Sequence, residues 1–260
     1  MDRMIYLSMS GAKAALQRQD SLANNLANVA TNGYKKSHAQ FEDLIYQNLR
    51  QSGSATSDQT QLPNGLQVGL GVRPVSTARD FSQGSLQQTG NSLDVAISGN
   101  GFLQVTMPDG TTGYTRDGSL KLDSQGQLVT NEGFIVQPGI TIPPQAQSIS
   151  IGADGTVTAT LPGTATPSTL GQLQLAGFAN PQGLDPKGGN IYAETAASGA
   201  PSAAAPGTNG LGRIQQGFVE TSNVNVVEEL VAMISTQRAY ELNSKAIQTS
   251  DQMLQRLGQL

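Results

Sequence analysis

The side chains that could carry catalytic or metal chemistry are few in this sequence. Its 260 residues include no Cys and a single His, His38, which excludes thiolate nucleophiles, Cys-type zinc or iron–sulfur sites and two-His mechanisms. A Ser-His-Asp triad would have to use His38, which lies just after the end of a predicted helix. The run Gly99-Asn100-Gly101 lacks the third glycine of a dinucleotide-binding loop. We therefore predict no catalytic residue, no metal and no cofactor.

The remaining candidates for chemistry are four carboxylates, Asp94, Asp117, Asp123 and Glu132. A glycosidase needs two carboxylates that flank a cleft. Three of these four fall in predicted turns, where Asp side chains bond the local backbone. Aromatic residues make up only 5% of the chain and Trp is absent, which weakens any sugar-binding platform. We predict that these carboxylates stabilise turns. A monomeric β-domain binding module or a glycan hydrolase stays as the alternative of a different class.

Charge and hydropathy limit the possible partners. The net charge is −4 and the pI about 4.9, which argues against nucleic acid. No apolar run approaches the roughly 18 residues of a membrane span. The first residues have no long apolar segment or cleavage site, so we expect no cleaved signal peptide. Hydrophobic residues are only 37% of the chain, a first hint that other molecules complete part of its core.

Composition divides the chain into three zones. Residues 1–40 and 218–260 contain no Pro and few Gly, whereas residues 41–217 hold all 12 Pro and most of the 30 Gly. Both ends have helical patterns. The middle has short alternating strands with Gly-bearing turns, which predict antiparallel β structure at 102–106, 113–116, 119–122, 127–130, 149–160 and 170–178. The fold class is therefore α+β, with helices at the two ends of the chain.

The first helix is predicted over residues 3–30. Its seam positions recur about every 3.5 residues, as in a coiled coil. They are Ile5, Met9, Ala12, Leu16, Gln19, Ala23 and Leu26. Asn32 and Gly33 are expected to cap its C-terminus, because Gly readily takes the left-handed conformation there.

The second helix is predicted over residues 226–257, with Asn225 as N-cap and Glu228 completing a capping box. Gly258 is expected to end it. Its seam has the same spacing, through Leu230, Met233, Gln237, Tyr240, Ser244, Ile247, Asp251 and Leu254. Polar seam residues fix the register of a coiled coil at a cost in stability. The alternative is that the seam lies one residue away.

Two arrangements of these helices stay open. They could lie as amphipathic helices on one globular domain, or the two chain ends could form a coiled coil. The seams hold few large apolar side chains to offset the entropy of ordering. We therefore predict that the helices are loose in the monomer and order only against copies of the same chain.

Three long motifs resemble the axial proteins of bacterial flagella, the rod and hook subunits. The run NNLANVATNGYK at Asn24–Lys35 is similar to their N-terminal signature. NSLDVAISGNGFLQV at Asn91–Val105 and YTRDGSLKLDSQGQLV at Tyr114–Val129 resemble their shared β-domain. TSNVNVVEELVAMISTQRAYELNSKAIQTSDQMLQ at Thr221–Gln255 resembles their C-terminal helix. Within the family, YQNLRQSGSATSDQTQLPNGLQVGLGVRP at Tyr46–Pro74 is similar to a stretch typical of distal rod subunits.

The resemblance implies a domain organisation. Residues 1–40 with 218–260 would form a terminal coiled-coil domain, and residues 81–204 a β-rich outer domain. Residues 41–80 with 205–217 would connect them and include the extended stretch 46–74. The stretch, marked by Tyr46, Arg50, Pro63 and Gly65, would be either a surface loop or an ordered arm against neighbouring subunits.

The resemblance also implies a function. The chain would be a structural subunit of the distal rod, assembling helically into a hollow, rigid shaft that transmits torque from motor to hook. Another rod subunit or a short hook-type protein is the alternative within the family. Expected partners are further copies, proximal rod subunits, hook protein, the surrounding periplasmic and outer-membrane rings and the flagellar type III export apparatus. The expected location is the basal body, from periplasm to outer membrane.

Particular polar residues are then expected in the assembly interface beside the apolar seams. Asn24, Asn25 and Asn28 would bond between neighbouring subunits, or else face solvent. Lys35 and Lys36 are predicted to be a solvated pair.

Overall fold

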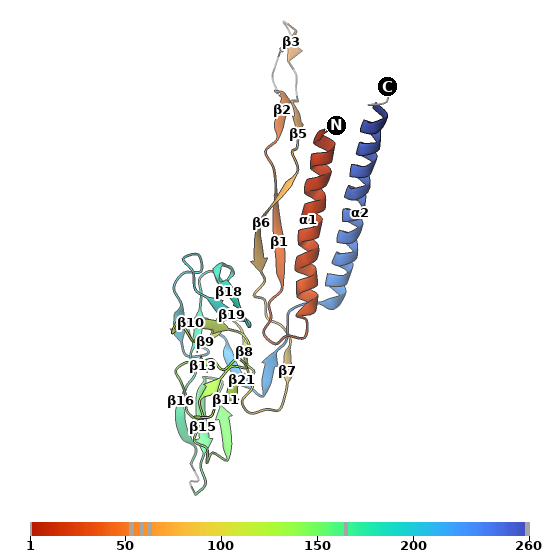
Figure 1. The fold of residues 1–260 in the computed structure, drawn as a ribbon. Helices are drawn as coiled ribbons and strands as arrows, with labels where there is room; N and C mark the ends of the chain where they lie inside the picture. Colours follow the sequence, from red (N-terminus) through yellow and green to blue (C-terminus); the bar gives the residue numbers. More distant parts are fainter. Residues whose placement is uncertain (1, 52–54, 58–59, 62–63, 164–165, 258–260) are drawn as a thin grey trace. The chain divides into compact units, whose positions relative to one another are not determined.

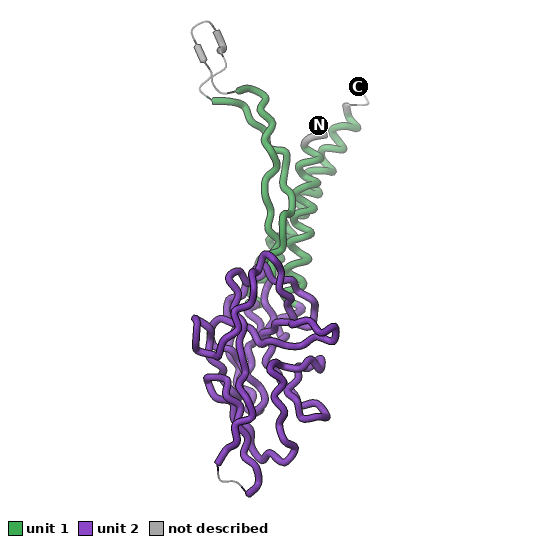
Figure 2. The backbone as a smooth tube through the Cα atoms, turned by 90° about the vertical axis from the view of Figure 1, so that its left-hand side faces the viewer, with its two compact units in different colours: residues 1–26, 37–78, 225–260 green, residues 27–36, 79–224 purple. Residues whose placement is uncertain are grey.

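The computed structural model describes residues 2–51, 55–57, 60–61, 64–163 and 166–257. The chain forms two compact units. Unit 1 comprises Met1–Leu26, Ser37–Ala78 and Asn225–Leu260, and unit 2 comprises Ala27–Lys36 and Arg79–Val224 (Figure 2). The chain from Ser37 to Ala78 belongs to the same unit as the helices, and the three domains with their bounds stay a prediction.

Unit 1 contains the two long helices, α1 (Asp2–Ala27) and α2 (Val226–Leu257), side by side (Figure 1). Asn25 of α1 donates a hydrogen bond of 3.2 Å to Glu229 of α2. Gly11 of α1 lies so close to Asn243 of α2 that an added Cβ would be 3.0 Å from its Oδ1. The second helix has the predicted bounds, whereas the first ends before the predicted residue 30.

The rest of unit 1 is a two-stranded β ribbon, which we call the arm (residues 37–78). Its strands pair in three successive ladders: β1 (Ser37–Asp43) with β6 (Val72–Arg79), β2 (Gln47–Arg50) with β5 (Leu66–Val68), and β3 (Ala55–Ser57) with β4 (Thr60–Gln61). At the start of β6 the arm contacts α1, where the backbone N–H of Val72 donates to Ser10 Oγ at 3.5 Å. The stretch 47–65 therefore contains paired strands in its described part, which fits the ordered-arm alternative.

Unit 2 is built on antiparallel strands, as predicted. Strand β9 (Phe102–Thr106) is central to a nine-stranded sheet, since it pairs with β10, β13 and β17. The other strands of this sheet are β10 (Thr112–Thr115), β11 (Lys121–Leu122), β12 (Leu128–Val129), β13 (Ile135–Val136), β17 (Leu175–Gly177), β18 (Asp185–Gly188), β19 (Ile191–Ala193) and β20 (Ser202–Ala204).

Smaller sheets complete unit 2. Strands β14 (Ser148–Ile151), β15 (Thr156–Thr160) and β16 (Ser168–Gln172) form a three-stranded sheet. Strand β8 (Val95–Ser98) pairs with β21 (Arg213–Gln216), and β7 (Leu86–Gln88) pairs with β22 (Phe218–Glu220). A short 3₁₀ helix spans Pro181–Gly183. An aliphatic core runs through the sheets, and a second cluster joins the aromatic rings of Phe102, Tyr114 and Tyr192.

The carboxylates singled out in the sequence are mostly used in local structure. Asp117 accepts the backbone N–H of Ser119 at 3.0 Å, and Asp123 accepts those of Gln125 and Gln127 at 2.8 Å. These are turn-stabilising bonds of the predicted kind. Asp94 instead accepts the Asn91 side chain at 3.0 Å and is buried.

Candidate assembly surfaces

Large hydrophobic side chains are exposed on unit 1 and almost absent from the surface of unit 2. Among the described residues, Leu122 is the only exposed large hydrophobic residue that belongs to unit 2. Those of unit 1 are Met4, Tyr6, Met9, Leu16, Ile45, Tyr46, Leu49, Leu66, Val75, Val226, Val227, Leu230, Val231, Ile234, Tyr240, Leu242, Met253 and Leu254. Apolar patches of this kind mark surfaces that another molecule covers.

The predicted seam of α1 is partly exposed in the single chain: Met9, Leu16 and Ala23 are exposed and the other four positions are half-buried. Met9 is 57% exposed and Leu16 45%, while Ile5 and Leu26 are half-buried. The face of α1 that is buried within the chain runs instead through Ala15, Leu22 and Asn25. The apolar stripe of this helix is thus available to another molecule.

The buried face of α2 is displaced from the predicted seam. Glu229, Thr236 and Ser250 are buried, and each lies one residue before a predicted seam position. The seam residues at those three places, Leu230, Gln237 and Asp251, are exposed. Among the others, Met233, Ser244 and Ile247 are half-buried, and Tyr240 and Leu254 are each 37% exposed. Packing inside the chain therefore follows the alternative register, one residue away.

The asparagines of the N-terminal motif have different roles. Asn25 is 2% exposed, and its amide bonds both the N–H and the C=O of Ser37, at 2.9 and 2.8 Å. Within the single chain the amide of Asn25 is thus already bonded, and its predicted bond to a neighbouring subunit stays a prediction. Asn24 is exposed, and Asn28 is half-buried and accepts from Thr31 Oγ1 at 3.2 Å.

Of the predicted helix caps, the structure shows the one at the start of α2 and not the one at the end of α1. Asn225 is an N-cap, since its Oδ1 accepts the backbone N–H of Val227 at 3.1 Å. Glu228 is exposed in the first turn of α2, and Gly258 lies outside the described residues. Asn32 and Gly33 do not cap α1, which ends at Ala27.

Asn32 and Gly33 instead form a tight turn within unit 2. Gly33 has φ +69°, and its N–H donates to the C=O of Glu220 at 2.8 Å. A Cβ at this position would lie 2.6 Å from the backbone nitrogen of Asp117. The left-handed glycine was predicted for the right residue, but its cause is close backbone contact rather than helix termination.

The arm presents a further apolar surface. Ile45 is 86% exposed and Tyr46 51%. Arg50 on β2 and Gly65 before β5 are also exposed. Pro63, the fourth residue of the predicted rod-specific stretch, lies outside the described residues. A two-stranded ribbon is marginally stable alone in water, so these side chains favour a covering molecule.

Known proteins match this chain over its whole length. Three family models match parts of the chain. The model of the flagella basal body rod protein matches residues 5–35, and that of the flagellar hook protein FlgE/F/G D1 domain matches residues 96–159. The model of the C-terminal region of flagellar basal body rod FlgEFG proteins matches residues 215–260. Flagellar basal-body rod protein FlgG of Buchnera aphidicola from Schizaphis graminum is 56% identical, over 98% of both chains. FlgG of Borreliella burgdorferi is 47% identical over 98% of this chain and 97% of its own. FlgG of Bacillus subtilis is 41% identical over 100% and 99%.

The chain belongs to the family of the flagellar basal-body rod protein FlgG. In this FlgG-family chain, the family models for the rod protein and for the C-terminal region match the residues of α1 and α2. These two helices carry exposed apolar side chains. Among the described residues, neither helix is long and apolar enough to cross a membrane.

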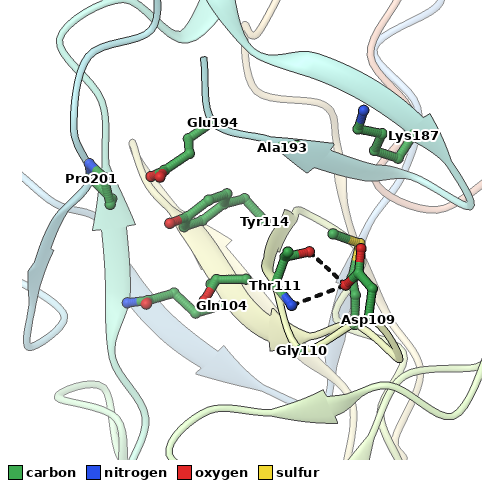
Figure 3. A pocket seen from close by; sticks show the side chains of 11 residues that line it. Gln104, Asp109, Gly110, Thr111, Tyr114, Lys187, Ala193, Glu194 and Pro201 are labelled. Atoms are coloured by element: carbon green, nitrogen blue, oxygen red, sulfur yellow. Dashed lines mark hydrogen bonds between the residues drawn. The ribbon is translucent and has the colours of Figure 1, made fainter. Parts of the chain in front are cut away.

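A hydrolase would need two suitable carboxylates in one pocket, and Figure 3 shows a pocket of this FlgG-family chain that contains two. It lies in unit 2, has a volume of about 1000 Å³ and contains two carboxylates, Asp109 and Glu194. Thr111 donates to Asp109 from its hydroxyl at 2.6 Å and from its backbone N–H at 2.9 Å. These bonds lower the pKa of Asp109, which makes it a poor proton donor. Glu194 lies beside Tyr114, whose pKa is raised first by burial and then by Glu194.

Sequence reasoning missed a buried ionic cluster in unit 2. Lys35 and Arg116 share one carboxylate, that of Glu220, at 2.5 and 3.1 Å. The side chains of Lys35 and Glu220 are completely buried, so the prediction of a solvated Lys35 is wrong. Burial lowers the pKa of Lys35, while Glu220 acts in the opposite direction. The local sequence carried no signal, because the three partners are far apart along the chain.

Proposed function

We propose that this chain is a structural subunit of the flagellar distal rod, and that copies of it assemble helically into a hollow, rigid drive shaft. The observation that carries the proposal is the distribution of exposed hydrophobic side chains, which lie on the helices and the arm and almost never on unit 2. In the proposed assembly, one exposed face of a subunit contacts a different face of the next subunit. Such heterologous contacts build an open helical polymer when the rotation between subunits does not close a ring. Membership of the FlgG family supports the same function.

In this proposal the two helices form a coiled-coil domain that is completed by neighbouring copies. Met9 and Leu16 on α1 and Leu230, Val231 and Ile234 on α2 supply its apolar contacts between subunits. Fully burying an exposed side chain of this size gains about 1.5–3 kcal/mol. Because these five side chains are 42–62% exposed in the single chain, part of that gain is left for contacts between subunits. Repeated along a helical lattice, such contacts resist torsion and so suit a shaft that transmits torque.

The arm is proposed to stiffen the shaft. Its exposed Ile45, Tyr46 and Leu49 would pack on neighbouring subunits. Deleting residues 47–65 is expected to give a softer, curved tube that resembles a hook. Straight rods of unchanged stiffness after this deletion would contradict the role.

The proposed partners are further copies, proximal rod subunits at one end and hook protein at the other, and the surrounding periplasmic and outer-membrane rings. The chain would reach the periplasm through the flagellar type III apparatus. Its location in the basal body follows from the family, and the finer placement from periplasm to outer membrane is part of the proposal.

A charged substitution on α2 tests the proposal. Val231 is 62% exposed, so Val231→Asp is expected to leave the monomer folded by circular dichroism but abolish concentration-dependent filaments in electron microscopy. Leu122→Asp is the matched control, because Leu122 is 40% exposed on β11 of unit 2. Filaments that form normally with Val231→Asp, or that are lost equally with Leu122→Asp, would refute this assembly surface.

A further inference from the structure

The pocket in Figure 3 collects polar side chains on one face of the nine-stranded sheet. Strands β9 and β10 pair in a register that places Gln104 directly opposite Tyr114. Tyr192 of β19 is the partner of Tyr114 on the other side, and Glu194 follows Tyr192 by two residues. Paired residues share a face of the sheet, and so do residues two apart along a strand. The strand register therefore brings Gln104, Tyr114 and Glu194 to the same pocket, which all three line.

Gln104 is buried, yet its side-chain amide is unpaired. The residue is 8% exposed, and its amide makes no hydrogen bond to another described residue. Among the described residues, Arg116 Nε is the only unpaired side-chain nitrogen or oxygen that is wholly buried. The amide of Gln104 therefore keeps accessible surface, which opens into the pocket that it lines. Because an unpaired amide at a buried position is unfavourable, Gln104 favours a ligand that hydrogen-bonds to it.

The polar ends of these side chains lie together at one end of the pocket. Figure 3 shows the amide of Gln104, the hydroxyl of Tyr114 and the carboxylate of Glu194 directed to the same side, toward Pro201. Tyr114 is 2% exposed, and its ring makes an edge-on contact with Phe178 at a centroid distance of 4.8 Å. Its ring therefore offers little open face on which a sugar can stack. Hydrogen bonds and charge, rather than aromatic stacking, determine what this end of the pocket binds.

The charges of the pocket are predominantly negative. Its lining contains the carboxylates Asp109 and Glu194 and one cation, Lys187. Lys187 is already paired with Asp185 at 2.9 Å, so these four groups sum to a charge of −2. Asp109 accepts two hydrogen bonds from Thr111, whereas Glu194 is exposed and has no ion-pair partner among the described residues. The uncompensated carboxylate beside the unpaired amide favours a cationic ligand.

We propose that this pocket binds a guanidinium group on an alkyl chain. The guanidinium donates to the carboxylate of Glu194 and to the amide oxygen of Gln104, and the alkyl chain packs against Met107 and Pro201 of the lining. A guanidinium fits better than an ammonium, because its rigid fork of N–H donors serves two acceptors at separate positions. An Arg side chain of a partner protein, or a small free guanidine, presents this chemistry. The site goes beyond the proposed rod function and does not depend on it.

The test follows the side-chain amide signals of Gln104 by nuclear magnetic resonance in the full chain, at concentrations below filament formation. The signals are assigned by their absence in Gln104→Met, which keeps the length of the side chain. Acetyl-arginine amide is expected to shift them saturably. Acetyl-citrulline amide, which has nearly the same shape without the charge, is expected to bind at least fivefold more weakly, and acetyl-lysine amide also more weakly. No saturable shift with acetyl-arginine amide, or equal affinity for either of the other two compounds, would overturn the proposal.

A second variant keeps the test independent of the folding of Gln104→Met. Glu194 is exposed, so Glu194→Gln is expected to fold and to weaken acetyl-arginine amide at least fivefold. Glu241→Gln is the matched control, because Glu241 is exposed on α2 of unit 1 and its replacement removes the same charge outside the pocket. Unchanged affinity in Glu194→Gln, or an equal loss in Glu241→Gln, would refute the site, since general attraction to an acidic protein would then explain the binding.

Methylguanidinium separates the two sources of the ligand. It presents the same charged group without the alkyl chain of an Arg side chain. Tighter binding of acetyl-arginine amide supports an Arg side chain of a partner protein, because the alkyl chain then contributes contacts. Tighter binding of methylguanidinium supports a small free guanidine.

Discussion

Replacing Glu220 by Gln should strongly destabilise unit 2. The carboxylate is completely buried and accepts from Lys35 at 2.5 Å, from Arg116 at 3.1 Å and from the backbone N–H of Gly84 at 2.8 Å. Gln keeps the size of the side chain but leaves two buried cations without a counter-charge, and its amide N–H group faces other donors. Removing one partner of a buried ion pair costs about 3–5 kcal/mol, a large fraction of the about 5–15 kcal/mol that stabilises a typical domain.

The assay is urea unfolding of the full chain, followed by tyrosine fluorescence and near-ultraviolet circular dichroism. The chain has no Trp and six Tyr. Tyr34, Tyr114 and Tyr192 are buried in unit 2, whereas the three tyrosines of unit 1 are already exposed, so the change in tyrosine signal on unfolding comes mainly from unit 2. Asp185→Asn is the matched control. It breaks the Lys187–Asp185 pair, whose side chains are 52% and 51% exposed, and should cost at most about 1 kcal/mol.

A double variant separates charge from packing. Adding Lys35→Met to Glu220→Gln removes one of the two cations left without a counter-charge. The loss of unfolding free energy in the double variant should therefore be about 1–3 kcal/mol smaller than the sum of the losses in the two single variants. The reasoning is refuted if Glu220→Gln costs no more than Asp185→Asn. It is also refuted if the costs of Lys35→Met and Glu220→Gln simply add, because the cluster would then not act as a unit.

Two more predictions concern the backbone and the pH dependence of unit 2. Gly33→Ala should lower the free energy of unfolding in urea by at least about 3 kcal/mol, because the added Cβ would lie 2.6 Å from the backbone nitrogen of Asp117. Gly90 also has a positive φ, +74°, but lies in open space, so Gly90→Ala should cost only about 1–2 kcal/mol. Equal costs for the two substitutions would contradict this reasoning. Burial raises the pKa of Tyr192 above its ordinary 10.0, so this residue contributes stability that is present below pH 10 and lost as the pH rises through its folded-state pKa. Stability measured from pH 9 to 11.5 should therefore fall less steeply in Tyr192→Phe than in the unaltered chain. Lys35, whose lowered pKa acts in the opposite direction, cancels in that comparison, and parallel curves would show that Tyr192 does not titrate as argued.

The sequence by itself determined the elements whose causes are local. The bounds of α2 follow from Asn225 at its start and from a helical pattern unbroken by Pro or Gly, and they were predicted correctly at 226–257. Strand β9 was predicted at 102–106 from alternation and the turn that follows it. Asp117 and Asp123 are predicted in turns because each begins a Gly-bearing turn pattern, and the structure shows their bonding partners within four residues. Three motifs in the correct order were enough to indicate the family.

Only the tertiary structure decided which faces are buried and which residues far apart in the chain meet. Lys35 and Lys36 have the composition of a solvated pair, yet Lys35 is buried because Glu220, far along the chain, supplies its counter-charge. Asn25 is buried and bonds Ser37 and Glu229, whereas Asn24 is exposed. The spacing of the asparagines in the sequence could not distinguish these two environments. A periodic pattern gives the apolar stripe of a helix but not the molecule that covers it. For this reason the seam residues predict contacts between copies, while the packing inside one chain follows a neighbouring face.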